Sequence, residues 1–331
     1  MTTLLAGDIG GTKTLLSLYG LGPDNQLNLI HSQRYRSADW ASLEPMLQAF
    51  LADTADGAER PAAACFAVAG PVQHGRARLT NLPWQLEEKA LAAATGIAAL
   101  ELVNDFAVLI YGLPQLGGDQ QALIKPGRAE ADQPLLVLGA GTGLGVAWGL
   151  PGVQGLQALA SEAAHGEFAP RSAAEWELKQ WLMADLALDR LSIERVVSGT
   201  GLGHVARWLL ACHHPAGDHP LARVSGDLPS AVAAAAAAGD PLGQEALALW
   251  LAAYGSVTGD LALASLSRGG IWLAGGTAGK LLESLRSPAF LEPFAAKGRL
   301  QAVLDPMPIM AVIDPAIGPF SAACRARMLM S

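Results

Sequence analysis

The stretch Gly7-Asp8-Ile9-Gly10-Gly11-Thr12-Lys13-Thr14 decides how the rest of the chain is interpreted. One apolar run, residues 4–6, leads into it, and a second apolar run, residues 15–19, leads out of it. Apolar runs joined by a glycine-rich turn are typical of two β-strands in a hairpin. We therefore expect a strand, a tight glycine turn and a second strand here.

A second segment repeats this design in the middle of the chain. Residues 135–138 lead into Gly139-Ala140-Gly141-Thr142-Gly143-Leu144-Gly145, and residues 146–148 lead out of it. Two copies of one hairpin in different halves of the chain predict a duplicated unit with a cleft between the copies.

Neither glycine loop fits the two common nucleotide-binding fingerprints. A Walker loop needs Gly-Lys-Ser/Thr at the start of a helix, whereas Lys13 follows Thr12 here. A Rossmann fingerprint also needs a helix next, but residues 14–18 have strand character, and Leu144 occupies the last glycine position of the second loop. A glycine hairpin can be a plain turn or a phosphate site. Two such hairpins, each with a threonine, favour phosphate binding, and Asp8 is a candidate Mg²⁺ ligand through water.

Composition narrows the class of protein. A length of 331 residues is more than one core usually fills, so two domains or lobes are expected. Hydrophobic residues make up 51% and charged residues 16%, which indicates a well-buried globular protein. A formal net charge of -8, without a local Lys/Arg cluster, disfavours non-specific nucleic-acid binding.

The cysteines and the apolar segments indicate the cellular compartment of the protein. The three cysteines, Cys65, Cys212 and Cys324, are scattered, which is typical of free thiols in a reducing compartment. The N-terminal residues lack the basic flank and apolar length of a signal peptide. Residues 246–264 are apolar but interrupted by Asp260, so a buried core helix is expected rather than a membrane span. We expect a cytoplasmic protein that does not enter a membrane.

Strands and helices alternate along the rest of the chain, which indicates an α/β protein. Strands are expected at residues 63–69 and 100–103, and helices at residues 105–111, 175–188 and 233–238 and from Pro241 onward, after the cap Asp240. The polar segment 119–134 places a domain boundary near residue 115.

Asn104-Asp105 stands between a predicted strand and a predicted helix. An acidic residue there can cap the helix, and the helix N-terminus favours its ionised form. It can also accept the proton of an attacking hydroxyl, since phosphoryl-transfer enzymes commonly orient the nucleophile with one aspartate. From this segment alone, both interpretations stay open.

Glu162 and His165 lie three residues apart between apolar runs. Glu-x-x-His occurs in di-iron bundles, but those require a second copy, which this sequence lacks. A solvated surface pair and a polar binding pair remain as alternatives to a metal site.

Several segments together resemble a known superfamily. The two glycine loops look like the phosphate loops of the actin, Hsp70 and sugar-kinase superfamily, and Ile271-Trp272-Leu273-Ala274-Gly275-Gly276 resembles its adenosine motif. Within it, three further segments resemble bacterial glucokinases: residues 102–106 (Leu-Val-Asn-Asp-Phe), 161–170 (Ser-Glu-Ala-Ala-His-Gly-Glu-Phe-Ala-Pro) and 194–199 (Glu-Arg-Val-Val-Ser-Gly). The resemblance extends from residue 4 to about residue 325.

The resemblance implies an α/β, actin-like (ribonuclease H-like) two-lobed sugar kinase fold with a duplicated βββαβα core and an interlobe cleft. Residues 1–115 and 305–331 would form the small lobe, and residues 116–304 the large lobe. The implied reaction is the ATP-dependent phosphorylation of D-glucose at the 6-hydroxyl. Many relatives of this kind are homodimers.

The resemblance also implies residue roles. Asp105 would be the catalytic base, and the sugar would be bound by Asn104, Asp105, Glu162, His165 and Glu194. Asn81, in a segment that resembles one lining the same cleft, is either a further sugar ligand or a turn residue before Pro83. The loops would bind ATP with Mg²⁺ at Asp8, through Gly7, Asp8, Ile9, Gly10, Gly11, Thr12, Gly141, Thr142, Gly143, Gly275 and Gly276.

Three positions depart from the family pattern. Ala163-Ala164 replaces a common Gly-Gly, Thr200 replaces a proline, and Lys13 replaces an asparagine. Alanine resists positive φ, so the loop with Glu162 and His165 is expected to be shaped differently, which bears on sugar selectivity. The alternatives are a kinase for mannose, fructose or an N-acetylhexosamine, an inactive sugar sensor, or an ATPase that ignores sugar. The sequence has neither the zinc-binding cysteine cluster nor the N-terminal DNA-binding helices of the related repressors, which favours a stand-alone enzyme.

Overall fold

The computed structural model describes residues 1–54, 60–79, 82–153 and 155–330, and Asn81 lies outside these ranges. Contacts divide the chain into two units, which we describe separately. The first unit comprises Met1–Gly117, Gly152–Ala160 and Asp314–Ser331, and the second comprises Gly118–Pro151 and Ser161–Ile313.

A five-stranded sheet forms the first unit, in the order β3-β2-β1-β4-β8. Its strands are β1 (Thr3–Ile9), β2 (Lys13–Leu21), β3 (Leu27–Arg36), β4 (Ala63–Val68) and β8 (Ala99–Asn104). β1 pairs antiparallel with β2 and parallel with β4, and β4 pairs parallel with β8. A small antiparallel sheet joins β5 (Val72–Gln73), β6 (Arg76–Arg78) and β7 (Gln85–Glu87).

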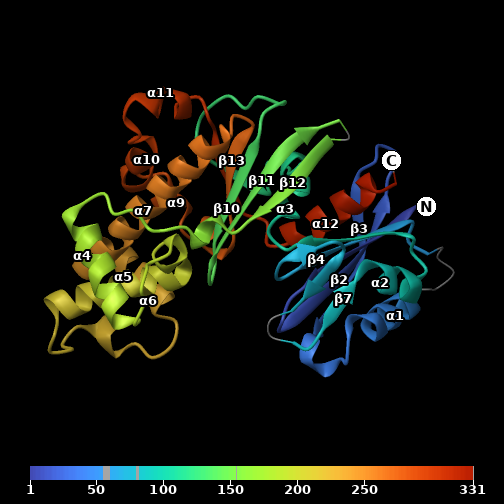
Figure 1. The fold of residues 1–331 in the computed structure, drawn as a ribbon, viewed down its shortest axis with the longest axis horizontal. Helices are drawn as coiled ribbons and strands as arrows, with labels where there is room; N and C mark the ends of the chain where they lie inside the picture. Colours follow the sequence, from blue (N-terminus) through green and yellow to red (C-terminus); the bar gives the residue numbers. More distant parts are fainter. Residues whose placement is uncertain (55–59, 80–81, 154, 331) are drawn as a thin grey trace. The chain divides into compact units, whose positions relative to one another are not determined.

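Helices cover both faces of the five-stranded sheet (Figure 1). On one face, Leu5 and Phe66 share a core with α1 (Leu43–Asp53) and α2 (Glu88–Thr95). On the other face, α12 (Ile317–Met328) packs against β1 and β4 and against α3 (Leu109–Gly112). Residues alternate between the two faces of a strand, so both faces need apolar cover, and β4 is accordingly buried throughout.

A six-stranded sheet, β12-β11-β10-β13-β14-β9, is built around the second hairpin. Its strands are β9 (Gln121–Lys125), β10 (Leu135–Ala140), β11 (Leu144–Gly152), β12 (Gly155–Ser161), β13 (Gly270–Ala274) and β14 (Ile309–Val312). β10 is antiparallel to β11 and parallel to β13, and β13 is parallel to β14. Both sheets thus share one topology, so the duplication predicted from the two glycine hairpins is confirmed.

Helices of the second unit pack around a long central helix, α7 (Pro241–Ser265), which contacts α5 (Gly199–His213), α6 (Leu228–Ala237) and α10 (Pro288–Ala295). The other helices there are α4 (Ala173–Asp185), α8 (Gly276–Lys280), α9 (Leu282–Leu285) and α11 (Gln301–Leu304). Short 3₁₀ turns lie at Ser37–Asp39, Leu113–Gln115, Ala163–His165, Ile193–Arg195, Pro220–Arg223 and Gly298–Leu300.

Within the described residues, α7 alone is long and apolar enough to cross a membrane. Trp250, Tyr254 and Thr258 on this helix are buried among other elements of the unit. The expected buried core helix is therefore confirmed. Its start is also as predicted, since the Asp240 side chain accepts the N–H of Gly243.

Two sequence expectations differ from the structure, and one strand was not foreseen. Residues 105–111 form a tight turn followed by the short α3, because Leu109, Ile110 and Tyr111 donate to carbonyls three residues back rather than four. The unforeseen strand is β9, which lies in the polar segment 119–134 and pairs antiparallel with β14. Residues 305–313, which the sequence placed with the small lobe, fall in the second unit because β14 pairs with β13.

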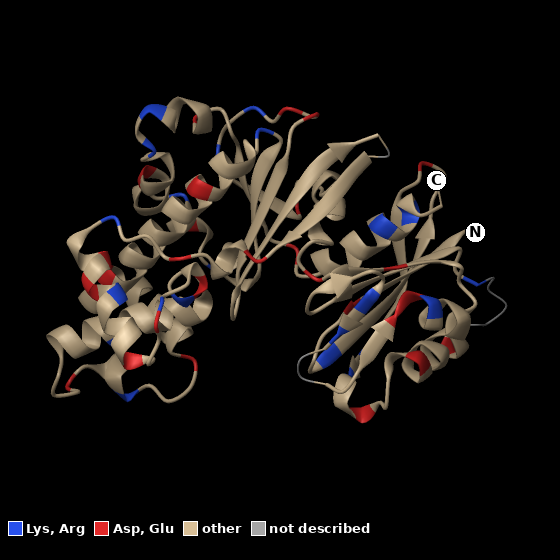
Figure 2. Ribbon diagram, viewed as in Figure 1, with Lys and Arg blue, Asp and Glu red and all other residues tan. Residues whose placement is uncertain are grey.

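Charged residues are interspersed along the ribbon of each unit, as Figure 2 shows. Acidic residues outnumber basic ones, 30 to 22 over the whole sequence. The described part of the chain holds no group of three or more His, Cys, Asp or Glu side chains placed to share a metal ion. The three cysteines are free thiols.

Candidate active site

The first glycine hairpin closes as a strand–turn–strand, as predicted. Ile9 is the register partner of Thr14, and the Gly10 N–H donates to the Lys13 carbonyl at 3.1 Å. No helix follows the turn, so the Walker and Rossmann interpretations are excluded by geometry.

A single serine, distant in sequence, holds this turn in place. The Ser37 N–H donates to the Thr12 carbonyl at 3.1 Å, and its hydroxyl donates to the Gly10 carbonyl at 2.8 Å. The same hydroxyl lies 3.0 Å from that of Thr14, and both side chains are fully buried. These bonds fix two carbonyls of the turn, while Thr12 stays exposed.

Asp8 lies at the carboxyl end of β1, next to the hairpin turn. Its Oδ2 is 3.6 Å from the position that a Cβ would occupy at Gly318, in the first turn of α12. Burial raises the pKa of this carboxyl above its ordinary value of 3.8. One partly buried carboxylate beside a phosphate-type loop fits Mg²⁺, which is usually held by one or two carboxylates together with substrate phosphates and water.

Asn104 ends β8 and Asp105 follows it, at the same edge of the sheet as the first hairpin. Ile9 is the register partner of Val68, and Val68 is the partner of Asn104, so the carboxyl ends of three neighbouring parallel strands form one row. The Asp105 N–H donates to the Val68 carbonyl at 2.9 Å. The sheet thereby brings together the Asp8 and Asp105 segments, which are almost 100 residues apart in the chain.

Asn104, not Asp105, has the capping role at the start of the turn. The Asn104 Oδ1 accepts the N–H groups of Phe106 and Ala107 at 3.1 and 3.0 Å. Its Nδ2 donates to the Gly70 carbonyl and to the Asp105 Oδ1, both at 3.1 Å. Four hydrogen bonds saturate this amide, since it has two N–H donors and two oxygen lone pairs. The same amide therefore also orients the Asp105 carboxylate.

The second hairpin, in the second unit, has the same form. Ala140 is the register partner of Leu144, and the Gly141 N–H donates to the Gly143 carbonyl at 2.8 Å. Thr142 stands exposed at the turn.

Residues 194–200 hold this second turn. The Gly199 N–H donates to the Gly141 carbonyl at 2.7 Å, and the Thr200 hydroxyl donates to the Thr142 carbonyl at 2.8 Å. These two bonds fix two successive carbonyls of the turn.

The adenosine-type motif adjoins the second hairpin, as its sequence predicted. β13 runs parallel to β10 and ends at Ala274, and Gly275 then takes a φ of 83°, which side chains rarely adopt. The helix α8 starts at the next residue, and the Thr277 hydroxyl donates to the Ala140 carbonyl at 2.6 Å. The carboxyl ends of two neighbouring strands thus present both glycine motifs together.

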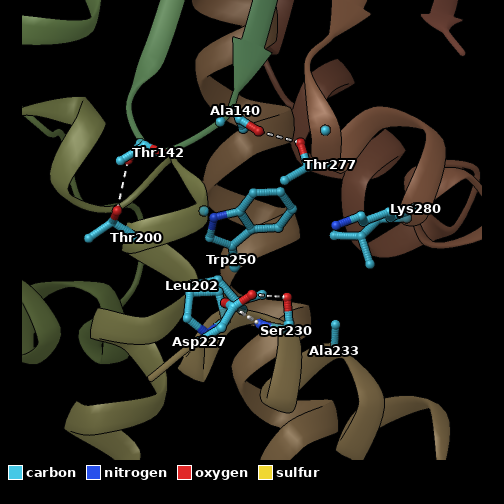
Figure 3. Close-up of a pocket in the computed structure, with 15 residues that line it drawn as sticks. Ala140, Thr142, Thr200, Leu202, Asp227, Ser230, Ala233, Trp250, Thr277 and Lys280 are labelled. Atoms are coloured by element: carbon cyan, nitrogen blue, oxygen red, sulfur yellow. Dashed lines mark hydrogen bonds between the residues drawn. The ribbon is translucent and has the colours of Figure 1, made fainter. Parts of the chain in front are cut away.

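A cavity of about 340 Å³ opens beside these motifs, entirely within the second unit (Figure 3). The buried Trp250 indole, whose N–H donates to the Ser198 carbonyl at 2.8 Å, forms part of its lining. Lys280 and Asp227 also line it. The pKa of Asp227 is lowered because the Ser230 hydroxyl and then the Ser230 N–H donate to its carboxylate. This size and mixed lining suit a small polar ligand with an apolar portion.

Glu162 and His165 lie on an exposed 3₁₀ turn of the second unit. The Glu162 Oε2 is 3.6 Å from the His165 Nε2, and the two side chains are 75% and 52% exposed. Ala163 and Ala164 between them take no positive φ. The alanines are therefore accommodated by a right-handed turn in which Ala164 is buried, without backbone strain.

Glu194 lies against the second hairpin. Its Oε2 accepts the Leu144 N–H at 3.0 Å. The predicted site residues fall into two groups. The first unit holds Gly7, Asp8, Ile9, Gly10, Gly11, Thr12, Asn104 and Asp105, and the second holds Gly141, Thr142, Gly143, Glu162, His165, Glu194, Gly275 and Gly276.

Sequence reasoning missed the residues that hold the loops. Ser37 and Thr277 lie in segments without any distinctive pattern, and Trp250 looked like an ordinary core residue. Only Ser198-Gly199 had a signal, as part of the segment that resembles glucokinases.

Comparison with known proteins agrees with this architecture. The family model Glucokinase matches residues 5–329. The glucokinase of Synechocystis sp. is 38% identical over 344 residues, covering 96% of each chain. That of Trichormus variabilis is 38% identical over 346 residues, covering 99% of this chain and 100% of the relative.

Solved structures resemble the whole chain. A glucokinase from an Antarctic psychrotroph aligns with a TM-score of 0.86 at 28% identity and covers 99% of both chains. A ROK family glucokinase from Streptomyces griseus, solved in complex with glucose and AMPPNP, shares the fold, with a TM-score of 0.63 at 19% identity over 98% of this chain and 99% of that one. The predicted actin-like sugar-kinase fold is confirmed. From its sequence and its fold alike, the chain belongs to the glucokinase family.

Proposed function

We propose that this protein transfers the γ-phosphoryl group of ATP to the 6-hydroxyl of D-glucose, giving glucose 6-phosphate and ADP. The observation that carries the proposal is the family match over residues 5–329. The arrangement of the individual residues supports it and assigns roles within the reaction.

The second hairpin and the Gly275-Gly276 turn bind the nucleotide in this proposal. The Thr142 hydroxyl is exposed at the turn, and glycines let backbone N–H groups approach phosphate oxygens closely. The adjoining cavity, with Trp250 in its lining and Asp227 and Lys280 at its polar positions, suits the nucleoside. The first hairpin, with Gly7, Ile9, Gly10, Gly11 and Thr12, binds phosphate in the same way.

Asp105 is the catalytic base. Phosphoryl transfer depends mainly on positioning and charge stabilisation, so the carboxylate needs to orient the attacking hydroxyl and accept its proton. The Asn104 amide holds the Asp105 carboxylate in one direction through the 3.1 Å hydrogen bond. Asn104 thus acts by orienting the base, and its contact with the sugar stays a prediction.

Glu162, His165 and Glu194 bind sugar hydroxyls. A fixed array of acceptors suits a polyol, because an analogue that lacks one hydroxyl leaves an acceptor unpaired. The unstrained turn at Ala163-Ala164 is compatible with this role for its two neighbours. Asn81 remains a proposed ligand outside the described residues.

Asp8 is the residue that would hold Mg²⁺. When bound, the ion neutralises charge on the phosphate oxygens. Asp8 itself supplies a partly buried carboxylate at the end of β1, within reach of the hairpin turn. We place the reaction in the cytoplasm, consistent with three free cysteines.

The test is ADP release from purified protein with Mg-ATP, with and without glucose, and with mannose, fructose and N-acetylglucosamine. Strong stimulation by glucose above the other sugars is the expected result. Greater stimulation by a different hexose would replace the substrate and keep the reaction. Equal ADP release with and without any sugar would indicate an ATPase, and no release at all would indicate a sensor.

A further inference from the structure

Glu194 connects two parts of the second unit that sequence reasoning treated separately. It was predicted to bind sugar, yet its Oε2 accepts the Leu144 N–H at 3.0 Å, at the end of the hairpin turn 50 residues away. Leu144 is the first residue of β11 and the register partner of Ala140, so this bond lies where the turn joins the sheet. A hydrogen bond to a charged acceptor is roughly twice as strong as one between neutral groups.

Packing at Gly143 fits this contact closely. A Cβ placed on Gly143 would overlap the Glu194 Oε2, and the three atoms nearest to that position outside the adjoining residues all belong to the Glu194 carboxylate. Glycine at residue 143 therefore leaves the room that the carboxylate occupies. The loop sequence and the position of Glu194 are complementary.

The backbone around Glu194 is itself fixed. The Glu194 carbonyl accepts the hydroxyl of the buried Ser198 at 2.7 Å, and the Ser198 carbonyl accepts the buried Trp250 N–H. Just before Glu194, the Ile193 N–H donates to the Gly166 carbonyl at 2.9 Å, in the segment that follows His165. The carboxylate is therefore aimed at the hairpin by a supported turn.

We propose that Glu194 is a positioning residue for nucleotide binding: it fixes the Gly143–Leu144 side of the second hairpin so that the turn presents its N–H groups to the phosphates. This role rests on the proposed function, in which that hairpin binds ATP. The contact joins two parts of the protein and involves no sugar atom, so its effect should be measurable without sugar. Within the described residues, Oε1 makes no hydrogen bond and stays available for the sugar contact.

The direct test is the affinity for AMPPNP without any sugar, measured by calorimetry. Glu194→Ala should weaken it by about tenfold or more, since one charge-assisted hydrogen bond is lost and the loop is released. Glu194→Gln keeps an acceptor oxygen and should change the affinity by less than about threefold. An unchanged affinity in Glu194→Ala would overturn the proposal and leave Glu194 as a sugar ligand alone.

Glu162→Ala is the matched control for removing a carboxylate of the predicted sugar set. The Glu162 side chain is 75% exposed and is paired with His165, away from the contact between Glu194 and the hairpin. This variant should raise KM for glucose while the sugar-free AMPPNP affinity stays within about twofold. An equal loss of AMPPNP affinity in both variants would show a general charge effect and contradict the positioning role.

A double-mutant cycle tests the contact from the loop side. Gly143→Ala should itself weaken AMPPNP binding, because the methyl group displaces the carboxylate. In the Glu194→Ala background the same methyl group has room, so its further effect should be less than about twofold. Additive losses would overturn the proposal. Thermal unfolding midpoints check that every variant folds, and a wild-type protein that binds no AMPPNP would overturn the proposed function itself.

Discussion

The two glycine hairpins share a backbone design and differ in what holds their turns. In the first, Ser37 bonds to the Thr12 carbonyl through its N–H and to the Gly10 carbonyl through its hydroxyl, so a neutral residue holds the turn. In the second, Gly199, Thr200 and the carboxylate of Glu194 share the task. The acidic residue at the first hairpin, Asp8, belongs to the hairpin strand β1. The acidic residue at the second hairpin, Glu194, comes from a segment 50 residues away. A duplicated fold can thus keep one loop geometry while each copy reaches it by different chemistry.

The difference also divides the expected functions. The sheet edge of the first hairpin carries Asp105, the proposed base, and that of the second carries the Gly275-Gly276 turn and the nucleoside cavity. Substitution of Asp105 in the first unit should therefore affect turnover. Substitution of the residues that hold the second hairpin should affect nucleotide affinity. The four predictions below test this division.

The largest effect is expected for Asp105→Ala. Loss of the base should lower kcat by about 10²-fold or more, while AMPPNP affinity stays unchanged because the nucleotide residues are intact. Steady-state kinetics and calorimetry measure the two quantities. Asp132→Ala, an exposed aspartate, serves as the control with wild-type kcat. More than about a tenth of wild-type turnover in Asp105→Ala would refute the assignment.

A smaller effect, on stability, is expected for Ser37→Ala. The Thr14 hydroxyl and the Gly10 carbonyl lose a buried partner, which should lower the free energy of unfolding by about 1–3 kcal/mol. Urea unfolding measures it. Ser32→Ala removes a similar hydroxyl contact, to Ser17, from an exposed position and should cost less than about 1 kcal/mol. Equal losses in the two variants would mean that Ser37 has no special role at the turn.

The sequence predicted those parts of the site that depend on local patterns, and it missed those that depend on contacts between distant residues. The hairpins, the helix start at Asp240 and the Gly275 turn were predictable because glycine, cap and strand patterns are local. Asp105 was found from its place between a strand and a turn, but the cap proved to be Asn104, because one amide could satisfy both following N–H groups. Ser37 and Glu194 were out of reach as supports, since only the sheet topology brings them to loops 23 and 50 residues away.

Asp8→Asn should have opposite effects on stability and activity. Burial raises the pKa of Asp8, so at pH 7 the ionised carboxylate makes the folded state less stable than a neutral side chain would. Neutralisation should raise the thermal midpoint at pH 7 and should abolish most turnover. The folded state holds the Asp8 proton more tightly than the unfolded state. The gain should therefore shrink as pH falls through the raised pKa toward 3.8, where wild-type Asp8 is also neutral.

Calorimetric scans at pH 7 and pH 4 compare the two proteins. A lower midpoint for Asp8→Asn at pH 7 would mean that the carboxylate, and not the burial cost, dominates at the first hairpin. Asp39→Asn, on the exposed turn after Ser37, is the control and should leave both midpoints unchanged.

The smallest effect is expected for Thr200→Val, which removes the hydroxyl bond to the Thr142 carbonyl and keeps the side-chain shape. Thr200 is exposed, so water can replace the lost donor, and unfolding should change by less than about 0.5 kcal/mol. Glu194 and Gly199 still hold the turn, so KM for ATP should rise by less than about threefold. Thr200→Ser restores the hydroxyl and should match the wild type. A loss in Thr200→Val as large as that in Ser37→Ala would mean that the second hairpin, like the first, depends on one hydroxyl, and the contrast between the two copies would disappear.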